Sequence, residues 1–352
     1  MRAILHALSY SDMELESSRK LADLKKLDPM RIFCRKLDAE VYNGDYKVPL
    51  RLYFPSEKAM EEMEGRAAEK LPGSLAEKAA EKLTGNSGEK VLETDFGKES
   101  EEARGRDILL FFHGGGWVTE SVENYDRVCA QMASSTGHLV VSVEYRLAPE
   151  HRFPTGLLDC YAAARALYRG ELLLPEPRQR MHLPDLHVDT KRITVIGDSA
   201  GGNLAAALCL MARDTGEFQV ERQILIYPAL NNCYTEESPF SSVQENGDGY
   251  LLTAKKMQRY LDLYQSSPED QQNPYFAPLL AENLQNMPRT LILTAEYDPL
   301  RDEGEAYGER LRKAGNEVTM HRIQEALHGF FALGIKFLHV QESFEYINQF
   351  LA

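Results

Sequence analysis

Hydrophobic and polar residues alternate in blocks along this chain, and the period within the blocks switches between that of strands and that of helices. Short runs of Val, Ile, Leu and Phe predict buried strands, whereas apolar residues spaced three and four apart predict amphipathic helices. After residue 106 the predicted strands are 107–112, 138–143, 193–196, 223–227, 290–294 and 317–323. The predicted helices are 124–134, 154–168, the stretch that follows residue 199, 303–314 and 340–350. This alternation indicates the α/β class, with a mainly parallel sheet covered by helices on both faces.

The first hundred residues depart from this alternation. Residues 9–30 predict an amphipathic helix, and strands at 32–42 and 48–54 predict an antiparallel hairpin with a longer loop. From 56 to about 106, Glu, Lys and Ala dominate, and the stretch has too few large apolar residues for a core of its own. It is therefore interpreted as a solvated helical insertion or a partly disordered loop. Two further departures are a polar stretch at 171–189 and a polar loop with an amphipathic helix (254–264) within 231–266.

Composition and charge narrow the classes of partner. The chain has 352 residues, 43% of them hydrophobic, which is enough for a large core. Its net charge of −14 argues against nucleic acid or an anionic membrane surface as a partner. The five cysteines are scattered, odd in number and without a CxxC pair, which argues against a disulfide framework or a zinc site. No signal-peptide core or membrane span is found, so the expected location is the cytoplasm.

The stretch from Gly197 to Gly201 carries the first chemical signal. A predicted strand precedes it, a predicted helix follows it, and Ser199 stands between the two glycines in a Gly-x-Ser-x-Gly pattern. Such a turn is too sharp for neighbouring side chains, and it lifts the serine hydroxyl above the edge of the sheet. The five-residue pattern alone fits a glycine-rich turn without chemistry equally well. The remaining candidate residues must therefore decide between the two.

A nucleophilic serine needs a base and a carboxylate. His328 follows the last predicted strand, where a loop can carry it over the serine. Asp298 follows the strand at 290–294 and is the preferred carboxylate, with Glu296 as the alternative. Asp302 is expected to pair with the adjacent arginine instead. The chain order of serine, aspartate and histidine is the one found on α/β-hydrolase sheets.

The glycine run that follows the strand at 107–112 supplies the second half of a catalytic site. Gly114, Gly115 and Gly116 let the backbone approach a carbonyl group, with N–H groups facing it. Together with the N–H of Ala200, they predict an oxyanion hole. A plain glycine loop is the alternative. A phosphate-binding loop is not favoured, because no Gly-Lys-Ser/Thr follows and no GxGxxG spacing exists.

Two motifs, HGGGW at 113–117 and GDSAGG at 197–202, resemble the paired motifs of the hormone-sensitive-lipase-like carboxylesterases, a family of the α/β-hydrolases. The segments YRLAPE at 145–150 and DPLRDEG at 298–304 are similar to further motifs of that family. The resemblance covers the chain from about residue 107 onward, and more faintly the first strands. It implies one α/β-hydrolase domain over 1–352 and a helical cap from about 1–30 and 231–266. The charged insertion at about 56–106 and the polar stretch at 171–189 depart from the pattern of that family.

The resemblance also implies a role for each residue of the site. Ser199 would be the nucleophile, His328 the general base and Asp298 the carboxylate that orients the base. Oxyanion donors would be Gly115, Gly116 and Ala200, and structural support would come from His113 and Asp198.

The expected function is that of a serine carboxylesterase acting on small, short- to medium-chain acyl esters through an acyl-enzyme. A small-molecule ester is the expected ligand, and no metal or organic cofactor is required. An amidase or peptidase with the same triad is one alternative. A non-catalytic ligand-binding protein, resembling the plant hormone receptors of this family, is another, although those lack the histidine found here at His328. A homo-oligomer is one option that the sequence leaves open.

Overall fold

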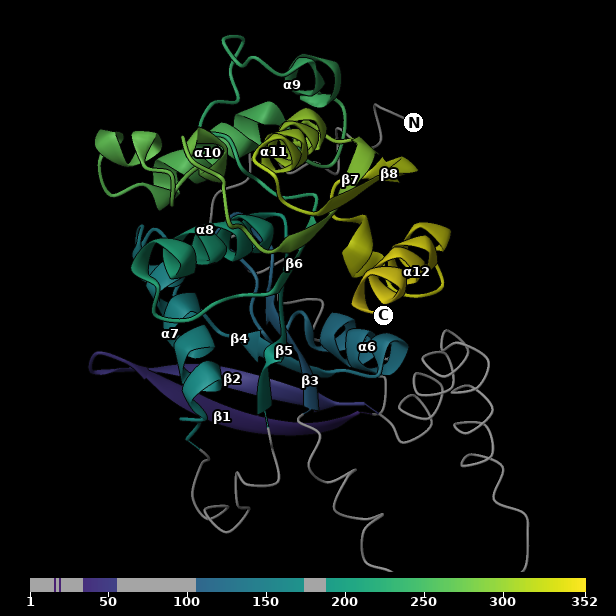
Figure 1. Cartoon of the computed structure of the whole chain (residues 1–352). Helices are drawn as coiled ribbons and strands as arrows, with labels where there is room; N and C mark the ends of the chain where they lie inside the picture. Colours follow the sequence, from purple (N-terminus) through teal and green to yellow (C-terminus); the bar gives the residue numbers. More distant parts are fainter. Residues whose placement is uncertain (1–15, 17–18, 20–33, 56–105, 174–187) are drawn as a thin grey trace, which may run out of the picture.

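The computed structural model describes Glu16, Arg19 and residues 34–55, 106–173 and 188–352. The predicted helix at 9–30, apart from Glu16 and Arg19, and nearly all of the insertion at 56–106 lie outside these residues. Eight strands form one sheet in the order β1-β2-β4-β3-β5-β6-β7-β8, with helices on both sides (Figure 1). The strands are β1 (Arg35–Asn43), β2 (Tyr46–Phe54), β3 (Arg106–Phe112), β4 (Leu139–Val143), β5 (Val188–Asp198), β6 (Arg222–Ile226), β7 (Arg289–Tyr297) and β8 (Val318–Leu327).

The strands from β3 to β8 are mutually parallel, whereas β1 and β2 form an antiparallel pair that joins the sheet antiparallel to β4. The predicted α/β class with a mainly parallel sheet is therefore confirmed. Because β2 runs against β4, the end of β2 at Phe54 lies at the same edge of the sheet as the start of β3 at Arg106. That edge is opposite the carboxyl ends of the parallel strands.

The first hairpin corrects one expectation from the sequence. Asn43 pairs with Tyr46, so the connection has only two residues, and the longer loop expected there is wrong. Gly44 adopts a φ of +59°, a conformation that glycine takes without steric cost. This lets the chain reverse within a two-residue turn.

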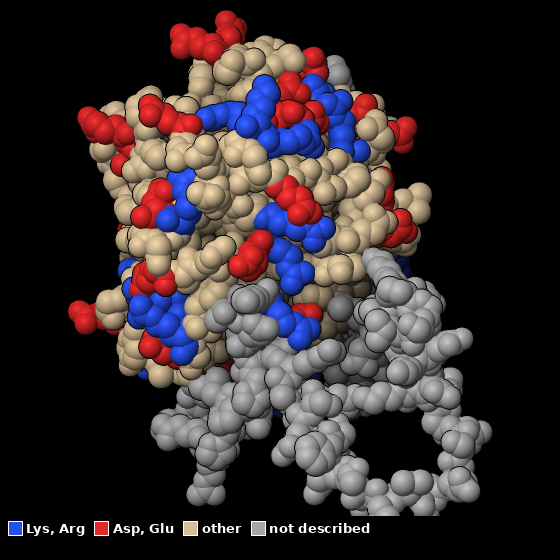
Figure 2. Space-filling model, viewed as in Figure 1, with Lys and Arg blue, Asp and Glu red and all other residues tan. Residues whose placement is uncertain are grey.

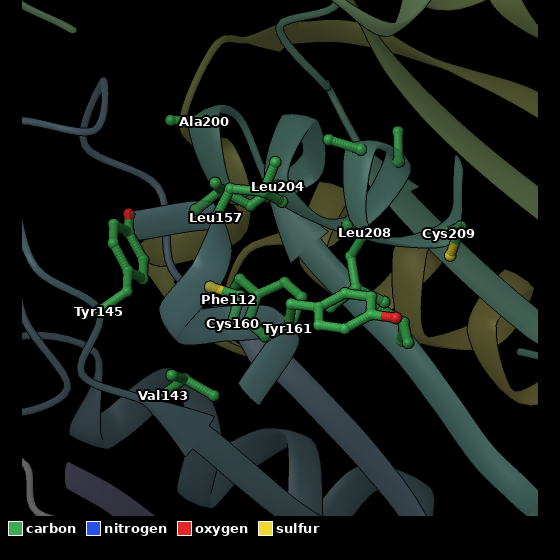
Figure 3. Close-up of a cluster of buried hydrophobic side chains, with 14 of the residues drawn as sticks. Phe112, Val143, Tyr145, Leu157, Cys160, Tyr161, Ala200, Leu204, Leu208 and Cys209 are labelled. Atoms are coloured by element: carbon green, nitrogen blue, oxygen red, sulfur yellow. The ribbon is translucent and has the colours of Figure 1, made fainter. Parts of the chain in front are cut away.

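Consecutive residues of a strand point to opposite faces of the sheet, and each face carries its own apolar core. On β3, Phe112 packs into the core beneath α7, α8 and α11, whereas Phe111 packs into the core beneath α6 and α12. Figure 3 shows the first of these cores, with Leu157 of α7 and Leu204 of α8 near Phe112. The helices are α6 (Asp126–Thr136), α7 (Thr155–Arg169), α8 (Ala200–Thr215), α9 (Ser241–Asn246), α10 (Ala254–Tyr264), α11 (Arg301–Lys313) and α12 (Leu338–Leu351), with 3₁₀ turns η4 (Pro268–Gln272), η5 (Pro278–Leu280) and η6 (Phe330–Leu333).

The segment 231–266 contains α9 and α10, which lie beyond the carboxyl ends of the strands in Figure 1. α10 has the predicted bounds, and its first turn is capped by the hydroxyl of Thr253, which accepts the N–H of Lys256 at 3.1 Å. Figure 2 shows acidic and basic side chains interspersed on one face of the protein. One ion pair joins α11 to α9, between Arg301 and Glu245 at 2.8 Å. Among the described helices, none combines the length and the apolar composition needed to cross a bilayer.

Candidate active site

Ser199 stands at the sharp turn between β5 and α8 with φ 56° and ψ −119°, a conformation that side-chain-bearing residues rarely adopt. Backbone hydrogen bonds hold this turn in place. The N–H of Ser199 donates to the carbonyl of Ile226 at 2.9 Å, and the N–H of Asn203 donates to the carbonyl of Ser199 at 3.1 Å. A Cβ at Gly197 would overlap the backbone of Gly201. The two glycines of the motif are therefore required by the close approach of strand and helix.

Ser199, His328 and Asp298 form one continuous hydrogen-bonded chain. His328 Nε2 lies 2.9 Å from Ser199 Oγ, and His328 Nδ1 lies 2.7 Å from Asp298 Oδ2. The other carboxylate oxygen of Asp298 accepts the N–H of Leu300 at 2.9 Å, and Asp298 is fully buried. Ser199 is 8% exposed, and the His328 side chain is 11% exposed. The arrangement can transfer a proton from the serine hydroxyl to an imidazole that a carboxylate orients.

The loop that carries His328 follows a distortion at the end of β8. The pairing of β7 with β8 shifts in register between Ala295 and Tyr297, and Glu325 adopts a φ of +56°. The ring of Tyr227 packs against His328, with 4.7 Å between ring centroids. After this irregularity the strand continues to Leu327, beyond its predicted end at residue 323. His328 therefore follows directly at the carboxyl end of β8, within hydrogen-bonding distance of Ser199.

The glycine loop adopts a backbone that favours glycine. Gly115 and Gly116 have φ values of +111° and +62°. The carbonyl of Gly115 accepts the N–H groups of Val118 at 3.1 Å and Thr119 at 3.0 Å, which closes the turn. The N–H of Gly114 donates to Asp198 Oδ1 at 2.8 Å. Within the described part of the chain, the N–H groups of Gly115 and Gly116 have no acceptor, so they can serve an external oxygen.

Asp198 connects the serine turn to the glycine loop. Besides the N–H of Gly114, its carboxylate accepts the hydroxyl of Tyr125 at 2.9 Å and that of Tyr227 at 3.4 Å. Burial raises the pKa of Asp198, while the hydrogen bond from Tyr125 acts in the opposite direction. One buried carboxyl thus contacts both the glycine loop and Tyr227, and Tyr227 is the residue whose ring packs on His328.

His113 lies beneath the glycine loop. Its Nδ1 donates to the carbonyl of Gly114 at 2.7 Å, and its ring stacks on Tyr145 with 4.3 Å between centroids. The hydroxyl of Tyr145 donates to the carbonyl of His113 at 2.7 Å. These contacts are local to the loop, and none of them reaches Ser199. Among the described residues, no cluster of three His, Cys, Asp or Glu side chains is placed to hold a metal ion.

The other carboxylates near the site have separate partners. Glu296 Oε2 accepts the N–H of Glu325 at 2.7 Å, and Asp302 pairs with Arg301 at 2.8 Å, as expected. The structure therefore brings Asp298, and neither of these two, to His328.

Glu303 is a site-adjacent residue that the sequence reasoning missed. Fully buried at the start of α11, it accepts three hydrogen bonds on Oε1, from the N–H groups of Leu230 (2.6 Å) and Asn231 (3.2 Å) and from the hydroxyl of Tyr234 (2.8 Å). Its Oε2 has no hydrogen-bond partner among the described residues. The sequence alone did not point to it, because a glutamate in the first turn of a helix is normally exposed. The one sequence feature that could have indicated its burial is its place in the motif at 298–304.

We expect Glu303 to make stability depend on pH. Burial raises its pKa from 4.5 to about 8, so between these values the unfolded chain has lost the proton that the folded protein keeps. The free energy of unfolding should therefore fall as pH rises through this window, by at most about 1.4 kcal/mol per pH unit from this group. Glu303→Gln, which keeps an acceptor oxygen and cannot ionise, should lack this contribution. Urea unfolding of both proteins at pH 5.5 and pH 8 measures it. A difference between variant and wild type that is the same at both pH values would contradict the expectation.

Comparison with known proteins places this chain in a family. A family model described as alpha/beta hydrolase fold matches residues 109–332. The chain is 36% identical over 224 residues to an arylesterase of Saccharolobus solfataricus, a match that covers 63% of this chain and 68% of that protein. It is 36% identical over 227 residues to an ethyl acetate hydrolase of Pseudomonas putida, covering 64% of this chain and 66% of that protein. The matches thus span about two thirds of these relatives.

A solved structure extends the likeness over nearly the whole chain. The structure of a hyperthermophilic esterase from the archaeon Pyrobaculum calidifontis superimposes with a TM-score of 0.75 at 32% sequence identity, covering 99% of this chain and 96% of that one. The serine turn and the glycine loop described above lie within the residues matched by the family model, whereas β1 and β2 precede them. The chain therefore belongs to the hormone-sensitive-lipase-like family of carboxylesterases, within the α/β-hydrolases.

Proposed function

We propose that this esterase hydrolyses small, uncharged acyl esters of short to medium chain length through an acyl-enzyme on Ser199. The observation that carries the proposal is the unbroken hydrogen-bonded chain from Ser199 through His328 to Asp298. In the first half-reaction His328 takes the proton of the serine hydroxyl as Oγ attacks the ester carbonyl, and Asp298 stabilises the resulting imidazolium. His328 then gives that proton to the departing alcohol. Water attacks the acyl-enzyme by the same route and releases the acid.

The negative charge of the tetrahedral intermediates would be held by backbone N–H groups. Those of Gly115 and Gly116 have no acceptor in the described part of the chain. Ala200 is the first residue of α8, so its N–H has no partner within the helix and lies at the positive end of the helix dipole. These groups are fixed before the reaction, so they stabilise the oxyanion without reorganising.

The preference for uncharged acyl groups follows from the burial of the site. Ser199 and His328 are almost completely shielded from water, the ring of Tyr227 packs against the histidine, and Phe330 packs against Tyr227. A charged acyl group would lose its hydration there without a partner. One relative is named an ethyl acetate hydrolase, and ethyl acetate is a small, uncharged ester, which supports the same substrate class.

We further assign to the cap the two segments predicted from the sequence, about 1–30 and 231–266. The described contacts of Arg19 support the first of these. Its guanidinium donates to the carbonyls of Val118 (2.9 Å) and Ala148 (2.8 Å) and to both carboxylate oxygens of Glu150 (2.7 and 2.8 Å). The hydrogen bond from Arg19 lowers the pKa of Glu150 to about 2, so the pair stays ionised at neutral pH. Arg19 is thereby attached beside the glycine loop.

The function is tested with p-nitrophenyl esters of acetate, butyrate and octanoate and with the anilide that matches the best of them. We expect saturable hydrolysis of the esters, and cleavage of the anilide slower by at least about 10²-fold, because an aniline needs stronger protonation to depart. Faster cleavage of the anilide would assign the triad to an amidase instead. Tight binding of the esters without turnover would favour a ligand-binding protein on this fold.

A further inference from the structure

We propose that Tyr260, on α10, is a positioning residue that holds the glycine loop in the conformation that presents the N–H groups of Gly115 and Gly116 to the oxyanion. The proposal rests on the proposed function of this site. It assigns to the 231–266 segment a part in the chemical step, in addition to covering the substrate. Three sets of contacts carry it.

The first contact is steric. A Cβ built on Gly116 would overlap the ring of Tyr260, so the ring lies directly against the backbone of the loop at this residue. Gly115 and Gly116 both have positive φ. Glycine populates more backbone conformations than any other residue, so two successive glycines hold one conformation only if their surroundings impose it. The Tyr260 ring closes one side of the loop and removes the room into which Gly116 could rotate.

The second contact is polar and reaches the other glycine. Thr119 Oγ1 donates to the carbonyl of Gly115 at 3.0 Å, and the side chain of Tyr260 interacts with this threonine. Burial raises the pKa of Tyr260, so the hydroxyl keeps its proton at neutral pH. Tyr260 therefore lies against Gly116 and beside the threonine that holds the carbonyl of Gly115.

The third set of contacts fixes α10 itself. Tyr264 lies one turn after Tyr260 on the same helix face and stacks on Trp117 with 4.5 Å between centroids and 3° between planes. Its ring also stacks on Phe276, whose carbonyl accepts the side-chain amide of Asn203 at 2.8 Å. Asn203 belongs to α8, the helix that follows the nucleophile. α10 is thus packed against both halves of the site, and a displacement of this helix would displace the oxyanion donors.

The test compares Tyr260→Ala and Tyr260→Phe with wild type and with Tyr275→Ala as a control. Tyr275 is a half-buried tyrosine whose hydroxyl bonds to Asp214 near the far end of α8. Each protein is assayed for kcat and KM on p-nitrophenyl butyrate. Each is also titrated with a trifluoromethyl ketone, which forms a tetrahedral oxyanion on the serine, and with the corresponding methyl ketone as a ground-state ligand.

We expect Tyr260→Ala to lower kcat by about 10- to 100-fold, less than the 10²–10³ for deleting an oxyanion donor, because the donors remain but are misplaced. Affinity for the trifluoromethyl ketone should fall in parallel, while KM and affinity for the methyl ketone stay within about threefold. Tyr260→Phe, which keeps the ring against Gly116, should stay closer to wild type than Tyr260→Ala, and Tyr275→Ala should match wild type.

Three outcomes would overturn the proposal. They are an unchanged kcat in Tyr260→Ala, a loss confined to KM and methyl-ketone affinity, and a kcat loss without any loss of trifluoromethyl-ketone affinity. If Tyr260→Ala does not fold, Tyr260→Leu decides, since it keeps an apolar side chain on α10 but removes the ring that lies against Gly116, and it must reduce kcat and trifluoromethyl-ketone affinity together. A wild-type protein that neither hydrolyses the ester nor reacts with the trifluoromethyl ketone would refute the proposed function instead.

Discussion

Replacing Ser199 with alanine is expected to lower kcat on p-nitrophenyl butyrate by at least about 10⁴ while the fold is retained. The hydroxyl is the group that His328 contacts at 2.9 Å, and it is the proposed nucleophile. The turn itself depends on backbone bonds from Ser199 to Ile226 and Asn203, which alanine keeps. Circular dichroism and thermal unfolding should therefore match wild type. Hydrolysis near the wild-type rate would remove Ser199 from the mechanism.

The pairing with His328 makes a stronger version of this test. Because the serine is nucleophilic only when the histidine takes its proton, His328→Ala and the double variant should be about as inactive as Ser199→Ala alone. Losses that add up, so that the double variant falls well below either single variant, would mean that the two residues act independently. The three variants are assayed at one pH with the same ester and at saturating concentration.

Asp298→Asn should reduce kcat by about 10³–10⁴, with little change in KM. The reason lies in the second oxygen of this carboxylate, which accepts the N–H of Leu300 at 2.9 Å. An asparagine must keep its oxygen toward Leu300, and its amide group then faces His328 Nδ1. The histidine would be forced to accept at Nδ1 and to carry its proton on Nε2, so it could no longer take the proton of Ser199.

Glu296→Gln is the matched control, because Glu296 is the other carboxylate that the sequence offers for this role. Its Oε2 accepts the N–H of Glu325, a bond that the glutamine oxygen can keep. We expect kcat within a few-fold of wild type. A loss in this variant as large as in Asp298→Asn would reverse the assignment of the carboxylate. Steady-state kinetics on the same ester as above gives both comparisons.

The order of strands and helices after residue 106 could be predicted because each buried strand is a short apolar run, and each helix keeps one apolar face. α10 has the predicted bounds, whereas α6 runs from 126 to 136 against an expected 124–134. The strand around Ile193 begins earlier than its apolar run, at Val188. Val188, the first residue of this strand, pairs with Arg106 of β3. Because the partner is far away in the sequence, the residues around Val188 show no alternating pattern that would predict a strand.

The candidate site could be placed to the extent that its residues stand in short motifs at strand ends. The turn at Ser199 and the glycine loop need glycine where the backbone approaches closely or adopts a positive φ. Their glycine spacing can therefore be recognised in the sequence. Glu303, Arg19 and Tyr260 could not be assigned in the same way. Their partners lie between 69 (Glu303 to Tyr234) and 144 (Tyr260 to Gly116) residues away along the chain. A lone glutamate, arginine or tyrosine on a predicted helix has no local signal for such a partner.

Because β2 joins the sheet antiparallel to β4, the structure indicates where a fused protein or a solid support can be attached. The chain leaves the sheet at Phe54 and re-enters it at Arg106, at the amino edge of the parallel strands. Ser199 stands at the carboxyl edge, roughly 20 Å away along strands of about six residues. A linker, a fused protein or a solid support joined at this exit point would face away from the nucleophile. Immobilisation through this edge should therefore orient every molecule with its catalytic edge toward the solution.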